Sequence, residues 1–483
     1  MKEAQTRTAE KLACANCAVL ARVAELEAEL ASTRTRLERA QRRIRELEIQ
    51  LGQNSQNSHR PPSSDPPGTP RPPRKPPSGR KPGGQLGHKG TNRKVLPPEK
   101  VDRIVRYAPE SCEKCHAPLP ELKPDEKPVA RHQTIDLREN PCEVIEYQAF
   151  GKTCVPCGHF TVAKIPDEVT RSAFGPRLTA LGSFLAGAAQ VSRRAIQEIF
   201  TDVLGAPIAL GTVSNMEAEV SKALETPYQQ AGEAVREASA KNIDETSWKH
   251  RNATVWLWGA ATSAVAFFVI HASRGYQGLK ALVGNVFRGM FSSDRWKAYC
   301  LRARRFRQIC WAHLVRDFQK LVDMGGVAGK LGKKAQDLAG YLFLIWNDFK
   351  KGFIDRATLQ EAMRPVRKEF RILLKRGVKL RDHRPRTFFE NLLDLEPALW
   401  SFLRVEGVEP TNNHAERILR TGVLWRKRGF ARFAERILTV VVSCRLQKKR
   451  AFPFLVEAIA AHRAGRAAPS LVAAEPAGAR AAA

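Results

Sequence analysis

Apolar residues near the N-terminus recur at alternating spacings of three and four, which predicts a coiled coil over residues 9–52. Such a heptad buries its a and d positions against a second helix. Position a holds Asn16, Val23, Leu30, Leu37, Ile44 and Leu51, and position d holds Leu12, Val19, Leu26, Thr33, Ala40 and Leu47. A single amphipathic helix packed on its own protein is the alternative. We favour a homo-oligomer formed through this helix, because no partner helix is near in the sequence.

After residue 240 the apolar period changes to that of strands. Three strand-like segments, "KNIDETSW", "TVWLWGAA" and "AVAFFVIHAS", precede a helix around "YQGLKALVG" and two further strands in "GMFSSDRWKAY" and "FRQICWAHL". This order predicts a mixed α/β unit. The uncharged run from Ala253 to Ile270 is long enough to span a membrane. Its small residues "GAATSA" separate two β-branched and aromatic halves, however, which favours two strands joined by a turn.

Two other stretches follow the helical period. Residues 170–235 contain "SRRAIQEIFTDVL", a turn "GAPIAL" and "GTVSNMEAEVSKAL", which suit a DNA-binding helix-turn-helix. Any helical hairpin gives the same pattern, so the signal is weak. Residues 330–404 are rich in helix formers, with helical apolar spacing in "LAGYLFLIW" and "VRKEFRILL". We predict that they form an all-helical insertion within the α/β unit.

One predicted helix carries polar residues where an apolar stripe is usual. In "EPTNNHAERILR", Asn413, Glu416, Arg417 and Arg420 stand at i, i+3, i+4 and i+7 and share one face. A solvated face with an ion pair between Glu416 and Arg420 explains this pattern in the simplest way. A functional site that uses Glu416 is the other explanation.

The charge balance points to the kind of partner. The 80 Lys and Arg residues against 49 Asp and Glu give a net charge of +31 and a pI near 10.1, which favours nucleic acid or a membrane surface. Residues 53–100 form a basic, Pro-rich linker that tracks a DNA backbone or serves as a spacer. Residues 464–483 form a low-complexity, disordered tail. No secretory signal is present in "MKEAQTRTAEKL", and we expect an intracellular protein without a membrane partner.

Ten cysteines in such a chain favour metal binding or free thiols over disulfides. Cys112 and Cys115 form one CxxC pair, and Cys154 and Cys157 form a second. Each pair presents two thiolates at the geometry that a tetrahedral Zn²⁺ needs, although the 38 residues between Cys115 and Cys154 are more than the usual gap. We therefore predict a zinc ribbon over residues 101–165, which folds around the ion and need not do chemistry.

Three acidic residues are candidates for a second kind of metal site. Asp244 and Asp294 stand at predicted strand ends, and Glu416 lies on the polar helix. Mg²⁺ prefers carboxylate oxygens, and phosphoryl transfer by bound Mg²⁺ needs about three carboxylates that converge from different elements. Glu245, adjacent to Asp244, points to the opposite face of its strand and is excluded from the same site. An isolated Asp at a strand end is more often a turn or cap residue.

These motifs occur together in a known family. "LGQNSQNSHRPPSSD" after the coiled coil, the two CxxC pairs, and "IDET", "SSDRWKAY", "CWAHLVRDF" and "NNHAERILR" stand in the order found in DDE transposases of insertion-sequence family sixty-six. The chain resembles this family over residues 12–430. After Arg420, "LWRKRGFARFAER" matches the family at Arg426 and Lys427 but lacks the asparagine that usually follows them. Trp311 and His313 also match, and we interpret His313 as a core histidine bonded to a backbone carbonyl.

The resemblance implies a multidomain α+β chain with a ribonuclease-H-like core at residues 236–329 and 405–460. It implies Mg²⁺ or Mn²⁺ as cofactor beside structural Zn²⁺, and Asp244, Asp294 and Glu416 as the catalytic residues. It implies that Arg417 and Arg420 contact DNA phosphate or orient the acid, and that Arg426 and Lys427 also bind DNA. The implied partners are double-stranded DNA, as terminal inverted repeats and target, and small accessory proteins of the same element, in the bacterial cytoplasm.

The sequence thus predicts a DNA transposase that cuts element ends and joins them to a target. Two other hypotheses use the same features. One is a catalytically inactive relative or regulator that binds the same ends, and the other is a structure-selective nuclease on the same core. Metal-dependent cleavage separates the first from an active enzyme, and strand transfer separates the second.

Overall fold

The computed structural model describes residues 22–51, with gaps at 24, 38–39, 42–43, 45–46 and 49–50, and residues 95–472, with gaps at 126, 140, 171, 251–252 and 424–430. The predicted linker up to residue 94, the basic residues Arg426 and Lys427, and the end of the tail lie outside these ranges. The described residues before 52 are helical, and Leu30 and Leu37 of the predicted seam are exposed. Their pairing with a second copy stays a prediction.

Contacts divide the chain into two compact units. One comprises Met1–Pro70, Ile165–Ile196 and Ala209–Ala483, and the other comprises Arg71–Lys164 and Gln197–Ile208. The first unit contains a sheet with helices and the second contains the cysteine pairs. The chain is therefore a mixed α+β protein of more than one part, as expected from the changes of period along the sequence.

A five-stranded sheet in the order β5-β4-β3-β6-β7 forms the centre of the first unit. Strands β3 to β5 pair antiparallel, and β6 and β7 continue the sheet parallel to β3. The bounds are β3 Ala240–His250, β4 Ala253–Ala261, β5 Ala266–His271, α7 Tyr276–Val283, β6 Met290–Ser293 and β7 Arg307–Ile309. The predicted order of three strands, a helix and two strands is confirmed.

The long uncharged run forms β4, a turn and β5, as its small residues predict. The hydroxyl Oγ1 of Thr262 accepts from the backbone N–H groups of Ala264 and Val265, which closes the turn at the predicted place. Within the described ranges, every helix is too short or too polar to cross a bilayer.

The outer edge of β5 is covered by one face of α15 (Ala431–Leu446). Ser443, Thr439 and Glu435 accept hydrogen bonds from the backbone N–H groups of alternate strand residues, namely Ala266, Phe268 and Ile270. Four helical residues rise about 6 Å and two strand residues about 6.6 Å, so the two spacings match. The helix thereby pairs the donors of an edge strand, which would otherwise be open to another chain.

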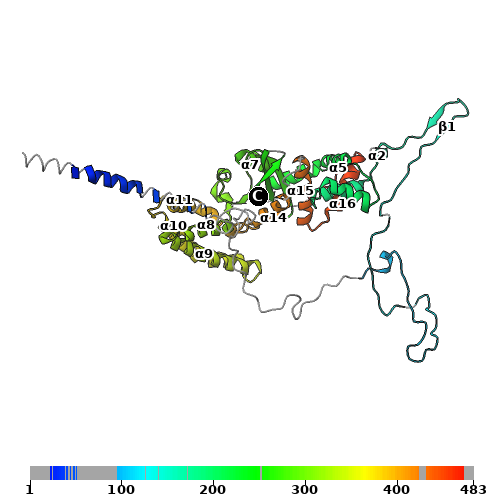
Figure 1. Cartoon of the computed structure of the whole chain (residues 1–483), viewed down its shortest axis with the longest axis horizontal. Helices are drawn as coiled ribbons and strands as arrows, with labels where there is room; N and C mark the ends of the chain where they lie inside the picture. Colours follow the sequence, from blue (N-terminus) through cyan, green and yellow to red (C-terminus); the bar gives the residue numbers. More distant parts are fainter. Residues whose placement is uncertain are drawn as a thin grey trace, which may run out of the picture. The chain divides into compact units, whose positions relative to one another are not determined.

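Most of the interval between β7 and the helix that carries Glu416 is helical (Figure 1), and the predicted insertion at residues 330–404 falls within it. They are α8 Trp311–Met324, α9 Gly326–Lys350, α10 Arg356–Gly377, α11 His383–Asp394, α12 Glu396–Leu399 and α13 Ser401–Arg404. Trp311 lies at their centre, with ring centroids 5.1 Å from Phe370 and 5.2 Å from Trp400. Its indole Nε1 donates to Leu399 O at 2.9 Å, which holds the end of the insertion beside β7.

The helices around the predicted helix-turn-helix are α3 Pro176–Gly187, α4 Arg193–Glu198, the π-helix η3 Ile199–Val203, α5 Leu210–Ala223, α6 Glu225–Glu237 and α16 Ala451–Arg463. The predicted second helix, α5, packs against α3, α15 and α16. Its Glu217 is buried and forms an ion pair with Arg193. DNA binding by this hairpin stays a prediction.

Candidate active site

Asp244 and Asp294 lie on neighbouring parallel strands. The register pairs Asn242 of β3 with Ser292 of β6, and two further steps along each strand bring Asp244 beside Asp294. Asp294 follows the last residue of β6, and its Oδ1 accepts from the N–H of Trp296 at 2.8 Å. Asp294 is therefore also a turn residue, as an aspartate at a strand end often is. That role still leaves its second oxygen for another partner.

Glu416 reaches the same region from α14 (Asn413–Val423), which packs on β3 and β4. The residue opposite Asp244 in β4 is Gly259, and a Cβ there would lie only 3.0 Å from the side chain of Leu419. The missing side chain lets α14 approach the sheet closely at this point. Ile418 and Leu419 bury the apolar side of α14, so Glu416 lies at the boundary between that side and the exposed one.

Asn412, directly before α14, fixes the start of this helix on the sheet. It is completely buried, and its Nδ2 donates to Ile243 O at 2.8 Å while its Oδ1 accepts from Asn242 Nδ2 at 3.0 Å. Its N–H donates to the sulfur of Cys310 at 3.1 Å. These bonds connect α14 to β3 directly beside Asp244, so Asn412 positions Glu416 relative to that carboxylate.

The acidic groups lie close enough to affect one another electrostatically. Burial raises the pKa of Asp244 well above its usual value, and the negative charges of Glu245, Asp294 and Glu416 raise it further. Like charges held together in this way disfavour ionisation. Asp294 and Glu416 are therefore near enough to Asp244 to act on its charge, although the oxygens of these three carboxylates do not form one group within 4.8 Å in the described residues. Asp244 lies inside β3 rather than at the predicted strand end, Asp294 directly follows β6, and Glu416 lies on α14. We call the three residues the carboxylate cluster, and a bound cation would relieve their repulsion.

Glu416 has an oxygen that fits such a cation. Its Oε1 is buried and accepts no hydrogen bond within the described part of the chain. The nearest basic nitrogens are His313 Nδ1 and Arg316 Nη2, each 3.7 Å away, which is beyond hydrogen-bonding distance. Arg420 is exposed, and no ion pair joins it to Glu416 in the described ranges. The solvated ion pair that offered the simplest explanation of the polar stripe is thus not formed.

Glu245 has hydrogen-bond partners of its own, although its charge acts on Asp244 and the charge of Asp294 acts on it. It is buried, accepts from Arg274 Nε at 3.0 Å and accepts from the hydroxyl of Tyr299. The guanidinium of Arg274 lies over the rings of Trp256 and Trp296, at 4.7 and 4.2 Å from their centroids. Burial and the charge of Asp294 raise the pKa of Glu245 to about 7. Trp296, in the turn after Asp294, donates its indole N–H to Arg274 O at 3.0 Å, so these residues support that turn.

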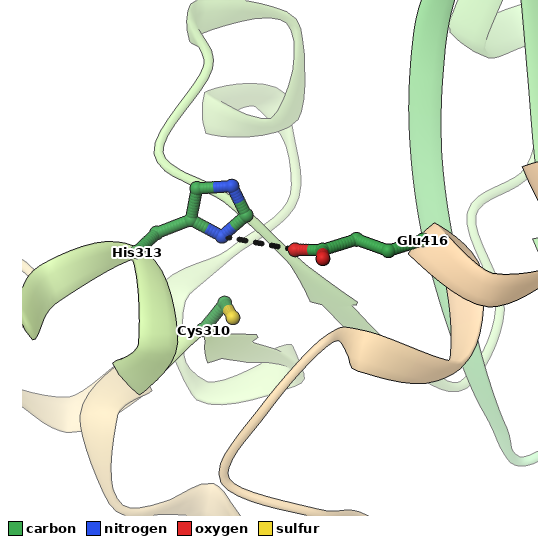
Figure 2. Close-up of side chains that lie close together, drawn as sticks. All are labelled: Cys310, His313 and Glu416. Atoms are coloured by element: carbon green, nitrogen blue, oxygen red, sulfur yellow. Dashed lines mark ion pairs between the residues drawn. The ribbon is translucent and has the colours of Figure 1, made fainter. Parts of the chain in front are cut away.

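Sequence reasoning missed part of the surroundings of Glu416. Figure 2 shows His313 pointing toward Glu416, with Cys310 close to both, although His313 was expected to be a core histidine. Cys310 precedes α8, and His313 and Arg316 lie on its first turns. These residues are three positions apart in "CWAHLVRDF", which puts them on one helix face. This spacing could have indicated that they lie together.

The two cysteine pairs adopt the same turn. Cys112 N–H donates to Ala117 O and His116 N–H donates to Cys112 O, and the corresponding bonds join Cys154 to His159 and Gly158 to Cys154. The second turn connects β1 (Gly151–Thr153) to β2 (Phe160–Val162). Backbone N–H groups of the turn lower the pKa of Cys112, and that of His159 lowers the pKa of Cys157. Both turns thus favour thiolates, although the four sulfurs do not form one group within the described residues.

The predicted DNA-binding residues are described only in part. Arg417 and Arg420 are exposed on α14, and Arg417 is adjacent to Glu416 in the sequence. An exposed guanidinium beside a carboxylate cluster is suitably placed for a phosphate, because Arg binds phosphate through paired N–H groups.

Comparison with known families adds an independent observation. The model of the transposase IS66 family matches residues 171–435, more than half of the chain and all three carboxylates. The chain belongs to the IS66 transposase family. A second model, of a family of unknown function (DUF6444), matches residues 16–94. No curated protein matches the chain. Family membership supports a transposase role and an enzyme that acts on DNA, of a class that generally uses divalent metals.

The repulsion at Asp244 leads to a stability prediction. Because its pKa is raised in the folded protein, folding favours the neutral acid, and stability falls as the pH rises above the unfolded value. In metal-free buffer at neutral pH, Asp244→Asn should therefore raise Tm, by about 2–4 °C for each kcal/mol gained in the free energy of unfolding. The gain should vanish below about pH 4, where aspartate is neutral in both states. Thermal denaturation of both proteins with EDTA at several pH values measures this, and a lower Tm for the variant at neutral pH would contradict it.

Proposed function

We propose that this IS66-family protein cuts the ends of an insertion sequence and joins them to target DNA, with Asp244, Asp294 and Glu416 as its catalytic residues. The observation that supports the proposal most strongly is the clustering of these three carboxylates. Asp294 and Glu416 are 122 positions apart (416 − 294), and a helical insertion separates them. Even so, the charges of both act on Asp244.

The residues present fit a divalent metal ion. The carboxylates are hard oxygen ligands, they repel one another, and Glu416 Oε1 is buried without a hydrogen-bond donor among the described residues. Asp244, Asp294 and Glu416 would hold Mg²⁺ or Mn²⁺. When bound, the metal supplies a Lewis acid and an activated oxygen nucleophile for phosphoryl transfer.

The protein's own residues have three tasks in this reaction. Asn412 and the turn that starts at Asp294 hold the carboxylates at fixed positions, so that the ligands need little rearrangement. The exposed Arg417 and Arg420 bind the phosphate backbone near the cut. The net charge of +31 draws DNA to the protein without regard to sequence.

The other parts of the chain would recognise and pair the DNA ends. We assign end recognition to the helices at 170–235, the zinc ribbon at 101–165 and the basic linker, and pairing of two protomers to the coiled coil. Two DNA ends must meet before joining, so a homo-oligomer fits the reaction. Bound accessory proteins and a cytoplasmic location are further parts of the proposal.

The zinc assignment predicts a metal content. Purified protein should contain zinc, and Cys154→Ser should lose about one equivalent, because one missing thiolate opens a closed tetrahedral site. Cys300→Ser is the matched control, since Cys300 is exposed and lies in the other unit. Elemental analysis of the three proteins measures this, and equal zinc in Cys154→Ser and wild type would disprove the ribbon.

The catalytic assignment is tested with a plasmid that carries the element's ends. Wild-type protein with Mg²⁺ should release the element and join it to a target plasmid, whereas Glu416→Gln should bind the ends and cut nothing. Glu406→Gln is the control, since Glu406 is an exposed carboxylate ten positions before Glu416 (416 − 406) and should keep activity. Binding without cleavage by the wild type would favour an inactive relative. Cleavage that ignores the ends and never joins them would favour a nuclease.

A further inference from the structure

The described residues contain one group of three metal-ligand types whose ligand atoms all lie within 4.8 Å of one another. It consists of the thiol of Cys310, the imidazole of His313 and the carboxylate of Glu416 (Figure 2). The group is drawn from three places: the residue before α8, the first turn of α8 and the first turn of α14. Glu416 is also a member of the carboxylate cluster described above.

The chemistry of this group differs from that of the carboxylate cluster. Mg²⁺ prefers oxygen ligands, whereas thiolate and imidazole together favour Zn²⁺ and similar transition metals. A tetrahedral zinc ion with bonds of about 2.0–2.1 Å to nitrogen and oxygen holds those atoms about 3.4 Å apart. His313 Nδ1 and Glu416 Oε1 are 3.7 Å apart, so an ion between them requires only a small movement.

A purely structural role accounts for Cys310 less well. A helix is best capped by Ser, Thr, Asp or Asn, whereas the residue before α8 is Cys310, whose sulfur is a weak hydrogen-bond acceptor. Its sulfur accepts the N–H of Asn412 at 3.1 Å and lies within 4.8 Å of the ligand atoms of His313 and Glu416.

We propose that Cys310, His313 and Glu416 form a transition-metal site that shares Glu416 with the catalytic carboxylates. Three protein ligands leave a fourth position open, as in zinc sites that exchange a ligand. Zn²⁺ bound there holds Glu416 on the α8 side and withdraws it from Asp244 and Asp294. The site then acts as an inhibitory control of the Mg²⁺-dependent reaction, a consequence that rests on the proposed function, whereas metal binding itself does not.

Cobalt is a suitable probe, because Co²⁺ replaces Zn²⁺ and absorbs light when a thiolate is its ligand. The full-length protein is first given one equivalent of Zn²⁺ to fill the cysteine pairs, and is then titrated with Co²⁺. Wild type should develop a thiolate-to-cobalt band with one equivalent. Cys310→Ser should lose the band, and His313→Gln and Glu416→Gln should bind Co²⁺ at least about tenfold more weakly because each loses a ligand.

Cys444→Ser is the matched control, because Cys444 is also buried but lies on α15 away from these ligands, and it should keep the band. A wild type that shows no band, or a Cys310→Ser variant that keeps it, would overturn the proposal. His313→Gln keeps the test decisive if Cys310→Ser fails to fold. If the protein binds Co²⁺ at this site but never cleaves DNA, the metal site is supported and the proposed function is disproved. If the protein cleaves DNA but does not bind Co²⁺, the proposed function is supported and the metal site is disproved.

Discussion

Replacing Asp294 by Asn should give a folded protein that no longer excises the element. Asn keeps the Oδ1 that accepts the N–H of Trp296, so the turn after β6 is retained. It removes the negative charge, however, and with it one ligand of the proposed metal site. A catalytic metal contributes several kcal/mol to transition-state stabilisation, and each 1.36 kcal/mol changes the rate tenfold, so we expect a loss of about 10³-fold or more.

The measurement is excision from a plasmid that carries the element's ends, with circular dichroism to establish folding. Asp382→Asn is the control, because Asp382 is exposed, caps no N–H with its side chain and belongs to the helical insertion. It should excise at the wild-type rate. Undiminished excision by Asp294→Asn would show that Asp294 is only a turn residue.

Replacing Asn412 by Ala should both destabilise the protein and slow its reaction. The substitution leaves Asn242 Nδ2 and Ile243 O without their partner in a buried place. An unsatisfied buried polar group costs about 1–3 kcal/mol, so we expect a loss of roughly 2–4 kcal/mol in the free energy of unfolding. Because Asn412 connects α14 to β3, Glu416 should also lose its fixed position beside Asp244, and cleavage should slow further.

Asn413→Ala is a closely matched control for this prediction. Asn413 is the next residue, carries the same side chain and is exposed at the first position of α14. Urea denaturation and cleavage assays of the two variants separate the roles of the two asparagines. Equal stability and activity of Asn412→Ala and Asn413→Ala would show that the buried amide does not position α14.

Much of the sheet was predictable because its signals are local. The small residues between Ala253 and Ile270 marked the turn that Thr262 closes, and strand alternation separated Glu245 from Asp244. The spacing in "NNHAERILR" marked a helix with Glu416 on its polar face. The strand register places Asp294 beside Asp244, and the charges of Asp294 and Glu416 both act on Asp244. The catalytic role of the three residues stays a prediction.

The supporting contacts were not predictable in the same way, because they join distant parts of the chain. Asn412 bonds to Ile243 across 169 positions, and no local period signals such a contact. His313 was interpreted as a core residue because a helical position alone does not show what faces it. Its nearness to Glu416 depends on the path of the whole helical insertion, which returns the chain to the edge of β7.

The central claim is that Asp244, Asp294 and Glu416 hold one divalent-metal site. Binding of Mn²⁺ tests it most directly, followed by electron paramagnetic resonance after one equivalent of Zn²⁺ has filled the cysteine pairs. The binding is compared among wild type, Asp244→Asn, Asp294→Asn and Glu416→Gln. We predict that the wild type binds Mn²⁺ in competition with Mg²⁺ and that each substitution weakens the same binding. Wild-type Mn²⁺ affinity in any one of the three variants would contradict a shared site.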